Sequence, residues 1–340
     1  MTVLALTGAL LAPLPASAVG DGGVYGTRKG KGISASAGQS RIKITQTSGP
    51  TGGKKGTLSS TKANWKPPLC WYEPIFTPEQ LKDFAENDGR GDVGLRQWWY
   101  GPVLWTDHFK DGKESINYLG TPRTSPGYKN YNLGKDGYFW RGYAPDITVV
   151  DDNSLCSSLM FWEDAGKIPD VPNAPTSKTL AEYAYNKVEV PGTEIELKPA
   201  AKSTVNVPTW VWLDKGTFKE VKVRAELPGT GLWAETTAKP VALHLTPGTS
   251  DATTSPSSGD CTINDDGSIG APFQKGDAGK TPPCGITYLR ATTGTPYQLK
   301  ASITWQVSWK GSDGTGGDLP DGTFETTQDV NVQEFQAVNR

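Results

Sequence analysis

Apolar and polar residues alternate without a break from Leu299 to Lys310. The apolar positions are Leu299, Ala301, Ile303, Trp305, Val307 and Trp309. A period of two over such a run predicts a long β-strand with one dry face and one solvated face. Because a strand in a parallel sheet is normally buried on both faces, the pattern also favours an antiparallel sheet.

The same period begins near residue 193 and recurs toward the end of the chain. The shorter alternating runs are Ile195 with Leu197, Val205 to Leu213, Val221 to Leu227, Val241 to Leu245 and Gly285 to Arg290. Strands of this kind, separated by Gly and Pro turns, predict an antiparallel β-sandwich over 191–340 with a long polar insertion at 246–283. In the last run the apolar positions change phase near Gln333–Glu334, which predicts a β-bulge there.

Residues 67–190 have a different pattern. Nineteen aromatic residues lie between Trp65 and Trp162, about twice the density of the whole chain. Thr77-Pro78-Glu79-Gln80 has the form of a capping box that starts a helix, and a second helix is expected from Ser177 to Lys187. Gly, Asn, Pro and Tyr are interleaved irregularly between them. We therefore expect an aromatic-rich, loop-rich α+β unit in front of the sandwich.

The N-terminal region differs in composition. Residues 1–18 resemble a secretory signal peptide, with an apolar run and a small-x-small site at Ala16-Ser17-Ala18, although no basic residue precedes the run. Nine basic residues and no acidic residue lie between Asp21 and Glu73, whereas the whole chain has a net charge of −2. Such a composition predicts a flexible basic segment over 19–66, with at most one marginal strand at Arg41–Thr45. A solvated linker and an electrostatic arm toward anionic polymers both fit it.

The four cysteines are Cys70, Cys156, Cys261 and Cys284. An even number of cysteines in an exported chain predicts two disulfides. Locality favours Cys70–Cys156 and Cys261–Cys284, because each pair then lies inside one predicted unit. The cysteines are widely spaced and the chain has two histidines, so we expect neither a metal site nor a cofactor.

Several motifs occur together in this chain. They are Cys70-Trp71-Tyr72-Glu73-Pro74, Leu180 to Tyr185, Pro208 to Asp214, Cys284 to Tyr288 and Ala301 to Trp309. With these motifs the chain resembles secreted actinomycete proteins of unknown function over roughly residues 70–340. Its C-terminal half is also similar to PKD-type (polycystic-kidney-disease) β-sandwich modules, although His244 to Gly248 stands where their usual Trp-Asp-Phe-Gly-Asp-Gly turn belongs. The resemblance implies an Ig-like sandwich and carries no activity with it.

Sequence motifs for nucleophilic or zinc catalysis are missing, since neither Gly-x-Ser-x-Gly nor His-Glu-x-x-His occurs. Ser40 and Lys43 match Ser-x-x-Lys by chance. Carboxylate pairs for glycoside hydrolysis need not be close in sequence, and four acids lie among the aromatic residues: Glu73, Asp107, Glu163 and Asp164. His108, beside Asp107, permits a general-base interpretation, but we expect a structural histidine there.

Other polar clusters have simpler explanations. Asp260, Asn264, Asp265 and Asp266 crowd one loop, but their spacing is not that of an EF-hand. Turn formation inside a disulfide loop accounts for them. His244 is expected on the solvated face of its strand.

Trp210 and Trp212 alternate with the core positions of their strand, so both should point away from the sandwich core. Large apolar side chains seldom lie bare together on a monomer. Two explanations follow: the tryptophans pack against the 67–190 unit, or they form a platform on which sugar rings or a peptide stack. Trp98 and Trp99 are further candidates for such a platform.

These observations lead to two hypotheses. The first is a secreted or cell-surface, non-enzymatic binding or structural protein whose partner is a cell-wall polysaccharide or a surface protein. The alternative is a secreted, glycosidase-like hydrolase with its acids in the aromatic-rich unit. Both place the protein outside the cell, and neither involves nucleic acid or a transmembrane segment.

Overall fold

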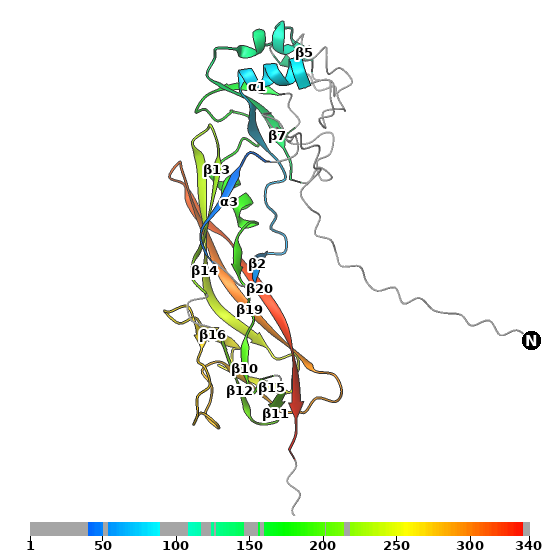
Figure 1. The fold of residues 1–340 in the computed structure, drawn as a ribbon, viewed down its shortest axis with the longest axis vertical. Coiled ribbons are helices and arrows are strands. Elements are labelled where there is room, and N and C mark those ends of the chain that lie inside the picture. The colour runs from blue at the N-terminus through cyan, green and yellow to red at the C-terminus, as the bar shows by residue number, and fades with distance from the viewer. Residues whose placement is uncertain are drawn as a thin grey trace, which may run out of the picture.

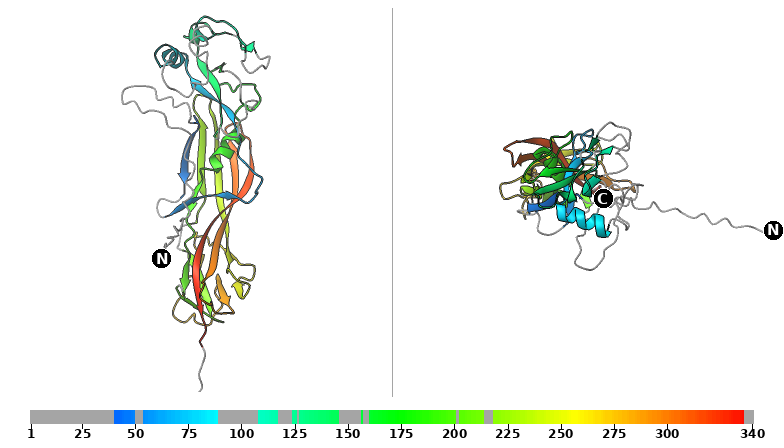
Figure 2. Two further views of the ribbon diagram at one scale, coloured as in Figure 1. Left: turned by 90° about the vertical axis from the view of Figure 1, so that its right-hand side faces the viewer. Right: turned by 90° about the horizontal axis from the view of Figure 1, so that it is seen from above.

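The computed structural model describes residues 40–49, 54–88, 108–116, 124–125, 127–145, 156, 160–200, 202–213 and 218–335. The molecule is elongated, and three long strands run along its axis (Figure 1). They are β14 (Leu232–Thr246), β19 (Tyr297–Gly311) and β20 (Gly316–Gln333). At about 3.3 Å per residue, β20 alone extends about 60 Å. An aromatic-rich cap lies at one end, and β20 finishes at the other end, which we call the lower pole (Figure 2).

Eight strands form the larger sheet within the described ranges. Their order is β1-β13-β14-β19-β20-β11, with β16 added beside β14 and β3 beside β20. The remaining bounds are β1 (Lys43–Ser48), β3 (Ser59–Ser60), β11 (Lys202–Thr204), β13 (Val221–Leu227) and β16 (Asp260–Thr262). The alternation predicted for β19 is confirmed, because its odd-numbered residues from 299 to 307 are buried and the residues between them are not.

Five described strands form the smaller sheet, in the order β10-β12-β18-β15 with β17 beside β12. They are β10 (Glu196–Lys198), β12 (Pro208–Leu213), β15 (Ala252–Ser255), β17 (Ile269–Gly270) and β18 (Gly285–Tyr288). Val211 and Ile286 of this sheet share one apolar cluster with Leu243 and Ala301 of the larger sheet. The C-terminal half is thus mainly β and predominantly antiparallel, as predicted.

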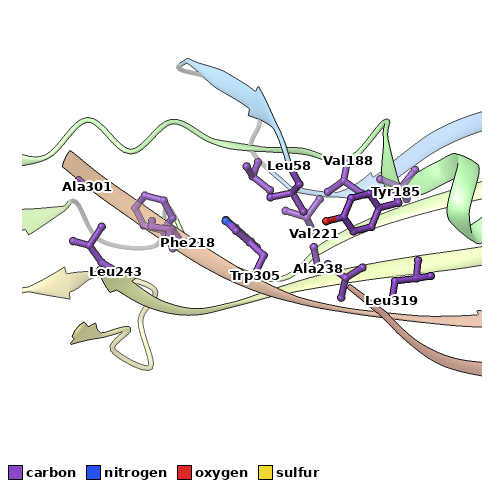
Figure 3. Packing of buried hydrophobic residues seen from close by; sticks show 14 of the residues in the cluster. Leu58, Tyr185, Val188, Phe218, Val221, Ala238, Leu243, Ala301, Trp305 and Leu319 are labelled. Carbon is purple, nitrogen blue, oxygen red and sulfur yellow. The ribbon is translucent and has the colours of Figure 1, made fainter. Parts of the chain in front are cut away.

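The upper part of the larger sheet is covered by a helix, α3 (Ser177–Tyr185). The predicted helix begins one residue after the N-cap Thr176, whose hydroxyl accepts from the backbone N–H of Thr179 at 3.1 Å. Tyr185 is buried at the end of α3 and lies near Val188, Val221 and Leu319 in Figure 3. A single continuous cluster therefore extends from beneath α3 to the smaller sheet.

Trp305 is buried near the middle of β19, at the centre of Figure 3. Both neighbouring strands shift register beside it, β14 between Pro240 and Ala242 and β20 between Leu319 and Gly322. An extra residue in one strand changes which face the following side chains occupy. Val241 is consequently 50% exposed, so the expectation that it shares a buried face with Leu243 is wrong.

The cap is built on a three-stranded antiparallel sheet of β4 (Trp71–Phe76), β7 (Gly137–Tyr143) and β8 (Phe161–Asp164). Helix α1 (Pro78–Asp83) starts with the predicted capping box between Thr77 and Gln80 and continues into the π-helical turn η1 (Phe84–Asp88). A second apolar cluster lies here, formed by Phe76, Leu81, Phe109, Tyr131, Phe139 and Met160. The turn η3 (Asn130–Asn132) and strands β5 (Ser115–Ile116) and β6 (Thr124–Ser125) complete the described part of the cap.

Both predicted disulfides are present. Cys70, directly before β4, is bonded to Cys156, and their Cα atoms are 6.2 Å apart. Cys261 of β16 is bonded to Cys284, directly before β18, and their Cα atoms are 5.4 Å apart. No cysteine is left free. Within the described ranges, no helix is long and apolar enough to span a membrane.

Part of the segment predicted to be flexible forms strands. β1 pairs with β13 at an edge of the larger sheet, and β2 (Lys55–Thr57) pairs with β9 (Glu189–Pro191). The Gln46 side-chain amide donates to the Glu189 carbonyl at 3.1 Å and accepts from the Glu189 N–H at 3.2 Å, which links β1 to β9. β13 and β9, the strands that pair with this segment, are far away in the sequence, so the composition of the segment alone could not predict the pairing. The predicted signal peptide lies outside the described residues.

Two details at the lower pole differ from the sequence predictions. β20 ends at Gln333, so no bulge forms at Gln333–Glu334, and Phe335 beyond it is 78% exposed. Val207 lies in the turn before β12 and is 43% exposed, although its number placed it on the buried face. In both cases the alternating pattern continues in the sequence beyond the point where the strand pairing stops.

Candidate functional site

Glu73 is a buried carboxylate in the middle of β4, and only 4% of it is exposed. Its Oε1 accepts hydrogen bonds from the Ser40 hydroxyl at 2.5 Å and from the Trp71 indole N–H at 2.7 Å. Its Oε2 accepts one from the backbone N–H of Arg41 at 2.6 Å. The carboxylate therefore joins the N-terminal segment to the cap sheet, and both of its oxygens are occupied.

Two arginines lie around this carboxylate. Arg141 is the residue directly opposite Glu73 in the pairing of β4 with β7. Burial lowers the pKa of Arg141, and the Glu73 charge opposes that effect. Arg41 donates from Nη2 to the Ile75 carbonyl at 3.0 Å. Burial also raises the pKa of Glu73, because the loss of hydration outweighs the three hydrogen-bond donors and the Arg41 charge.

This arrangement is suited to anchoring a chain segment. A carboxylate that is buried and hydrogen-bonded through both oxygens holds its donors in place, and this one holds Ser40 and Arg41 against β4. In the sequence, Ser40 is part of a chance Ser-x-x-Lys match. No sequence pattern connects Ser40 with Glu73, because the two residues are 33 positions apart and meet only in the folded structure.

The other acids considered for hydrolysis are not assembled around Glu73. Asp164 is at the exposed end of β8, where it accepts from the Trp162 indole at 3.1 Å and pairs with Lys167 at 2.8 Å. The hydrogen bond from Lys167 lowers the pKa of Asp164. Glu163 is partly exposed on β8, and Asp107 lies outside the described residues. Asp164 therefore shares no hydrogen-bond partner with Glu73.

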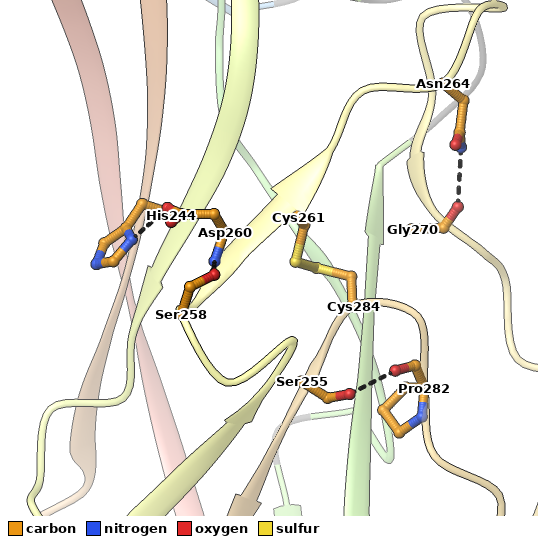
Figure 4. The surroundings of a disulfide bond; sticks show 9 residues. All are labelled: His244, Ser255, Ser258, Asp260, Cys261, Asn264, Gly270, Pro282 and Cys284. Atoms are coloured by element: carbon orange, nitrogen blue, oxygen red, sulfur yellow. Dashed lines mark hydrogen bonds and ion pairs between the residues drawn. A yellow bond between two sulfur atoms is a disulfide. The ribbon is translucent and has the colours of Figure 1, made fainter.

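The two histidines have different environments. His108 is 2% exposed, and its Nδ1 lies 2.9 Å from the Lys113 carbonyl oxygen. Phe109 and Tyr128 meet its ring edge-on, and burial lowers the pKa of His108. His244 lies on the solvated face of β14 as predicted, with its Nδ1 2.7 Å from Asp260 (Figure 4). These contacts identify His108 as a structural histidine packed in the cap.

The acidic loop near Cys261 is held by turn contacts. Asp266 accepts from the Ser268 hydroxyl at 2.5 Å and from its N–H at 2.9 Å. Asn264 donates to the Gly270 carbonyl at 3.1 Å, as Figure 4 shows. Among the described residues, no group of three or more His, Cys, Asp and Glu side chains could hold a metal ion.

Trp210 and Trp212 lie on the face of β12 that points away from the shared core. Trp210 is 7% exposed, and the ring of Phe273 meets it edge-on with centroids 5.7 Å apart. The insertion therefore contacts Trp210, which corrects the expectation that the 67–190 unit covers it. Trp212 remains partly exposed, between Glu196 of β10 and Gly270 of β17. Trp98 and Trp99 lie outside the described residues.

Comparison with known proteins adds no relative. No family model, no curated protein and no solved structure matches this chain.

Proposed function

We propose that this protein is a secreted or cell-surface, non-enzymatic binding or structural protein built on a PKD- or Ig-like β-sandwich. The observation that carries the proposal is the elongated body. One continuous core along β14, β19 and β20 connects the aromatic-rich cap with the smaller sheet. Such a body keeps its two ends apart and presents them to different partners, which suits display or linkage at a cell surface.

The pairing of the cysteines supports the location. All four are in disulfides, one in the cap and one between β16 and β18. Disulfides persist in oxidising compartments. Together with the signal-peptide pattern of residues 1–18 and the resemblance to secreted actinomycete proteins, this favours an extracellular protein that is associated with the cell wall.

A cell-wall polysaccharide is the partner that we favour. Trp212 supports this choice, because it is a partly exposed aromatic ring on the outer face of the smaller sheet. Aromatic rings offer a large apolar surface at low cost in conformational entropy, and sugar rings have apolar faces that stack on them. Glu196, the cross-strand neighbour of Trp212, provides a carboxylate that can accept hydrogen bonds from sugar hydroxyls.

Titration with soluble cell-wall polysaccharide tests the proposal. Tryptophan fluorescence would measure binding, and reducing-sugar release would be assayed in the same samples. We expect saturable binding without sugar release, weakened at least tenfold in Trp212→Ala. Trp233→Ala is the matched control, because Trp233 is also partly exposed but lies on β14, where the Arg224 guanidinium sits 4.0 Å from its ring centroid. Equal binding by both variants would reject the Trp212 platform, and sugar release would favour the hydrolase alternative.

A further inference from the structure

A stretch rich in serine and threonine surrounds strand β15, near the lower pole in Figure 1. Eight of the thirteen residues 246–258 carry a hydroxyl group, two are prolines, and Asp251 is the only charged residue. Stretches of serine, threonine and proline are the sequence type that carries O-linked sugars in exported proteins. Here the stretch has a defined structure, because it follows β14, forms β15 and leads into β16.

Four of the eight hydroxyls are held in hydrogen bonds within the protein. Two of them accept from the backbone N–H two residues further on, and the other two donate to backbone carbonyls. They belong to Thr249, Thr254, Ser255 and Ser258. The Ser255 hydroxyl, for example, donates to the Pro282 carbonyl at 2.8 Å (Figure 4). Each of these hydroxyls would have to break its hydrogen bond before an enzyme could modify it.

The other four hydroxyls have no hydrogen-bond partner among the described residues, and all four residues are exposed. They belong to Thr246, Ser250, Thr253 and Ser257. Thr246 directly precedes one of the two prolines, and Ser257 directly follows the other. A transferase needs an accessible hydroxyl oxygen with a free lone pair, and these four residues provide it.

The backbone of β15 is accessible as well. β15 is the last strand of the smaller sheet, and it pairs with β18 alone. Thr253 lies opposite Thr287, on the face turned away from the apolar cluster that contains Ile286 and Tyr288. Another protein can bind an edge strand by pairing with its unpaired backbone groups. A transferase can therefore hold β15 along its open edge and reach Thr253 from the solvated face.

We propose that these four free hydroxyls are sites of O-linked glycosylation. In each transfer the hydroxyl oxygen bonds to the anomeric carbon of a sugar, and the bond from that carbon to the phosphate of a glycosyl phosphate donor breaks. The phosphate leaves with the bonding electrons, and the hydroxyl proton passes to a base of the transferase. Bulky, hydrated sugars around β15 would block the pairing of its open edge with another strand. Such a transfer requires the extracellular location proposed above but not the Trp212 platform.

Mass spectrometry of the intact chain, secreted by an actinomycete that glycosylates exported proteins, tests the proposal. We expect masses above that of the polypeptide by whole sugar units, and peptide mapping with the sugars still attached should place them within residues 246–258. The increments should disappear when Thr246→Ala, Ser250→Ala, Thr253→Val and Ser257→Ala are combined in a fourfold variant. Thr262→Ala is the control and should keep the increments, because Thr262 is also exposed but lies on β16, outside the stretch.

Three outcomes would overturn the proposal. They are a secreted chain with the mass of the unmodified polypeptide, sugars located outside residues 246–258, and sugars on the four hydrogen-bonded hydroxyls as often as on the four free ones. Near-ultraviolet circular dichroism of the fourfold variant would verify that the core is intact, and the mapping of the wild type does not depend on any variant. Trp212→Ala should carry the same sugars as the wild type, so this test and the polysaccharide test fail independently.

Discussion

Glu73 offers the sharpest test of how this fold is held together. Replacing it with alanine removes a buried carboxylate and deprives Ser40, Trp71 and Arg41 of their acceptor. A hydrogen bond to a charged group contributes about 1.5–3 kcal/mol, and removing one partner of a buried charged set costs about 3–5 kcal/mol. Since these contributions are not additive, we expect Glu73→Ala to lower the free energy of unfolding by about 3–5 kcal/mol.

Urea denaturation followed by tryptophan fluorescence would measure this loss, and limited trypsin digestion would localise it. Arg41 is held by its own hydrogen bond to Ile75 and by Glu73, so we expect cleavage after Arg41 to become much faster in Glu73→Ala. Glu73→Gln keeps one carbonyl acceptor and should lose less, about 1–3 kcal/mol. Glu163→Ala is the control, because Glu163 is partly exposed on β8 of the same sheet. A loss below about 1 kcal/mol in Glu73→Ala, with unchanged cleavage, would refute the anchoring role.

Three further predictions concern other parts of the core. Burial lowers the pKa of His108 in the folded protein, so the unfolded chain takes up the proton at a higher pH, and the free energy of unfolding should fall as the pH drops below about 6.5. His108→Gln should make the free energy of unfolding less dependent on pH between about pH 7 and 5. An unchanged pH dependence would contradict this prediction. In urea denaturation, Trp71→Phe should lower the free energy of unfolding by about 1–3 kcal/mol more than Trp305→Phe does. The reason is that the Trp71 indole N–H donates to Glu73, whereas the Trp305 indole N–H has no partner among the described residues. Equal decreases in the two variants would contradict this prediction. Gly270→Ala should lower the melting temperature clearly more than Gly279→Ala, although both glycines have a positive φ. An added Cβ at Gly270 would lie 2.4 Å from the Val211 carbonyl oxygen, whereas none of the described atoms lies within 4 Å of an added Cβ at Gly279. A larger decrease in Gly279→Ala would refute the packing argument.

Local patterns predicted much of the fold. The alternation in β19, the capping box at Thr77 and the locality of the two cysteine pairs each depend on residues close in sequence or on simple counting. The errors fall where the alternating pattern goes on but the pairing changes. Val241 points outward because β14 has an extra residue opposite β19 at this point. The alternation along β14 cannot predict this, because the register depends on how β14 pairs with β19.

The candidate site was harder to predict. The sequence drew attention to Glu73 because aromatic residues surround it, but its partners come from Ser40 and Arg41 in a segment whose composition indicated flexibility. Trp210 and Trp212 were correctly placed on the outer face of their strand. The contact of Trp210 with Phe273 depends on how the disulfide-tethered insertion folds back, and no periodicity encodes that path.

The sequence alone determined the mainly β class of the C-terminal half and the starts of two helices, because hydrophobic periodicity and capping act over short stretches of chain. It favoured the observed disulfide pairs, because each pair lies inside one predicted unit. The tertiary structure decided that the N-terminal segment joins the sheet, that Glu73 anchors it, and that Phe273 of the insertion packs on Trp210. These features depend on contacts between segments that are far apart in sequence. The stability of such a contact depends on both segments, so neither segment predicts it by itself.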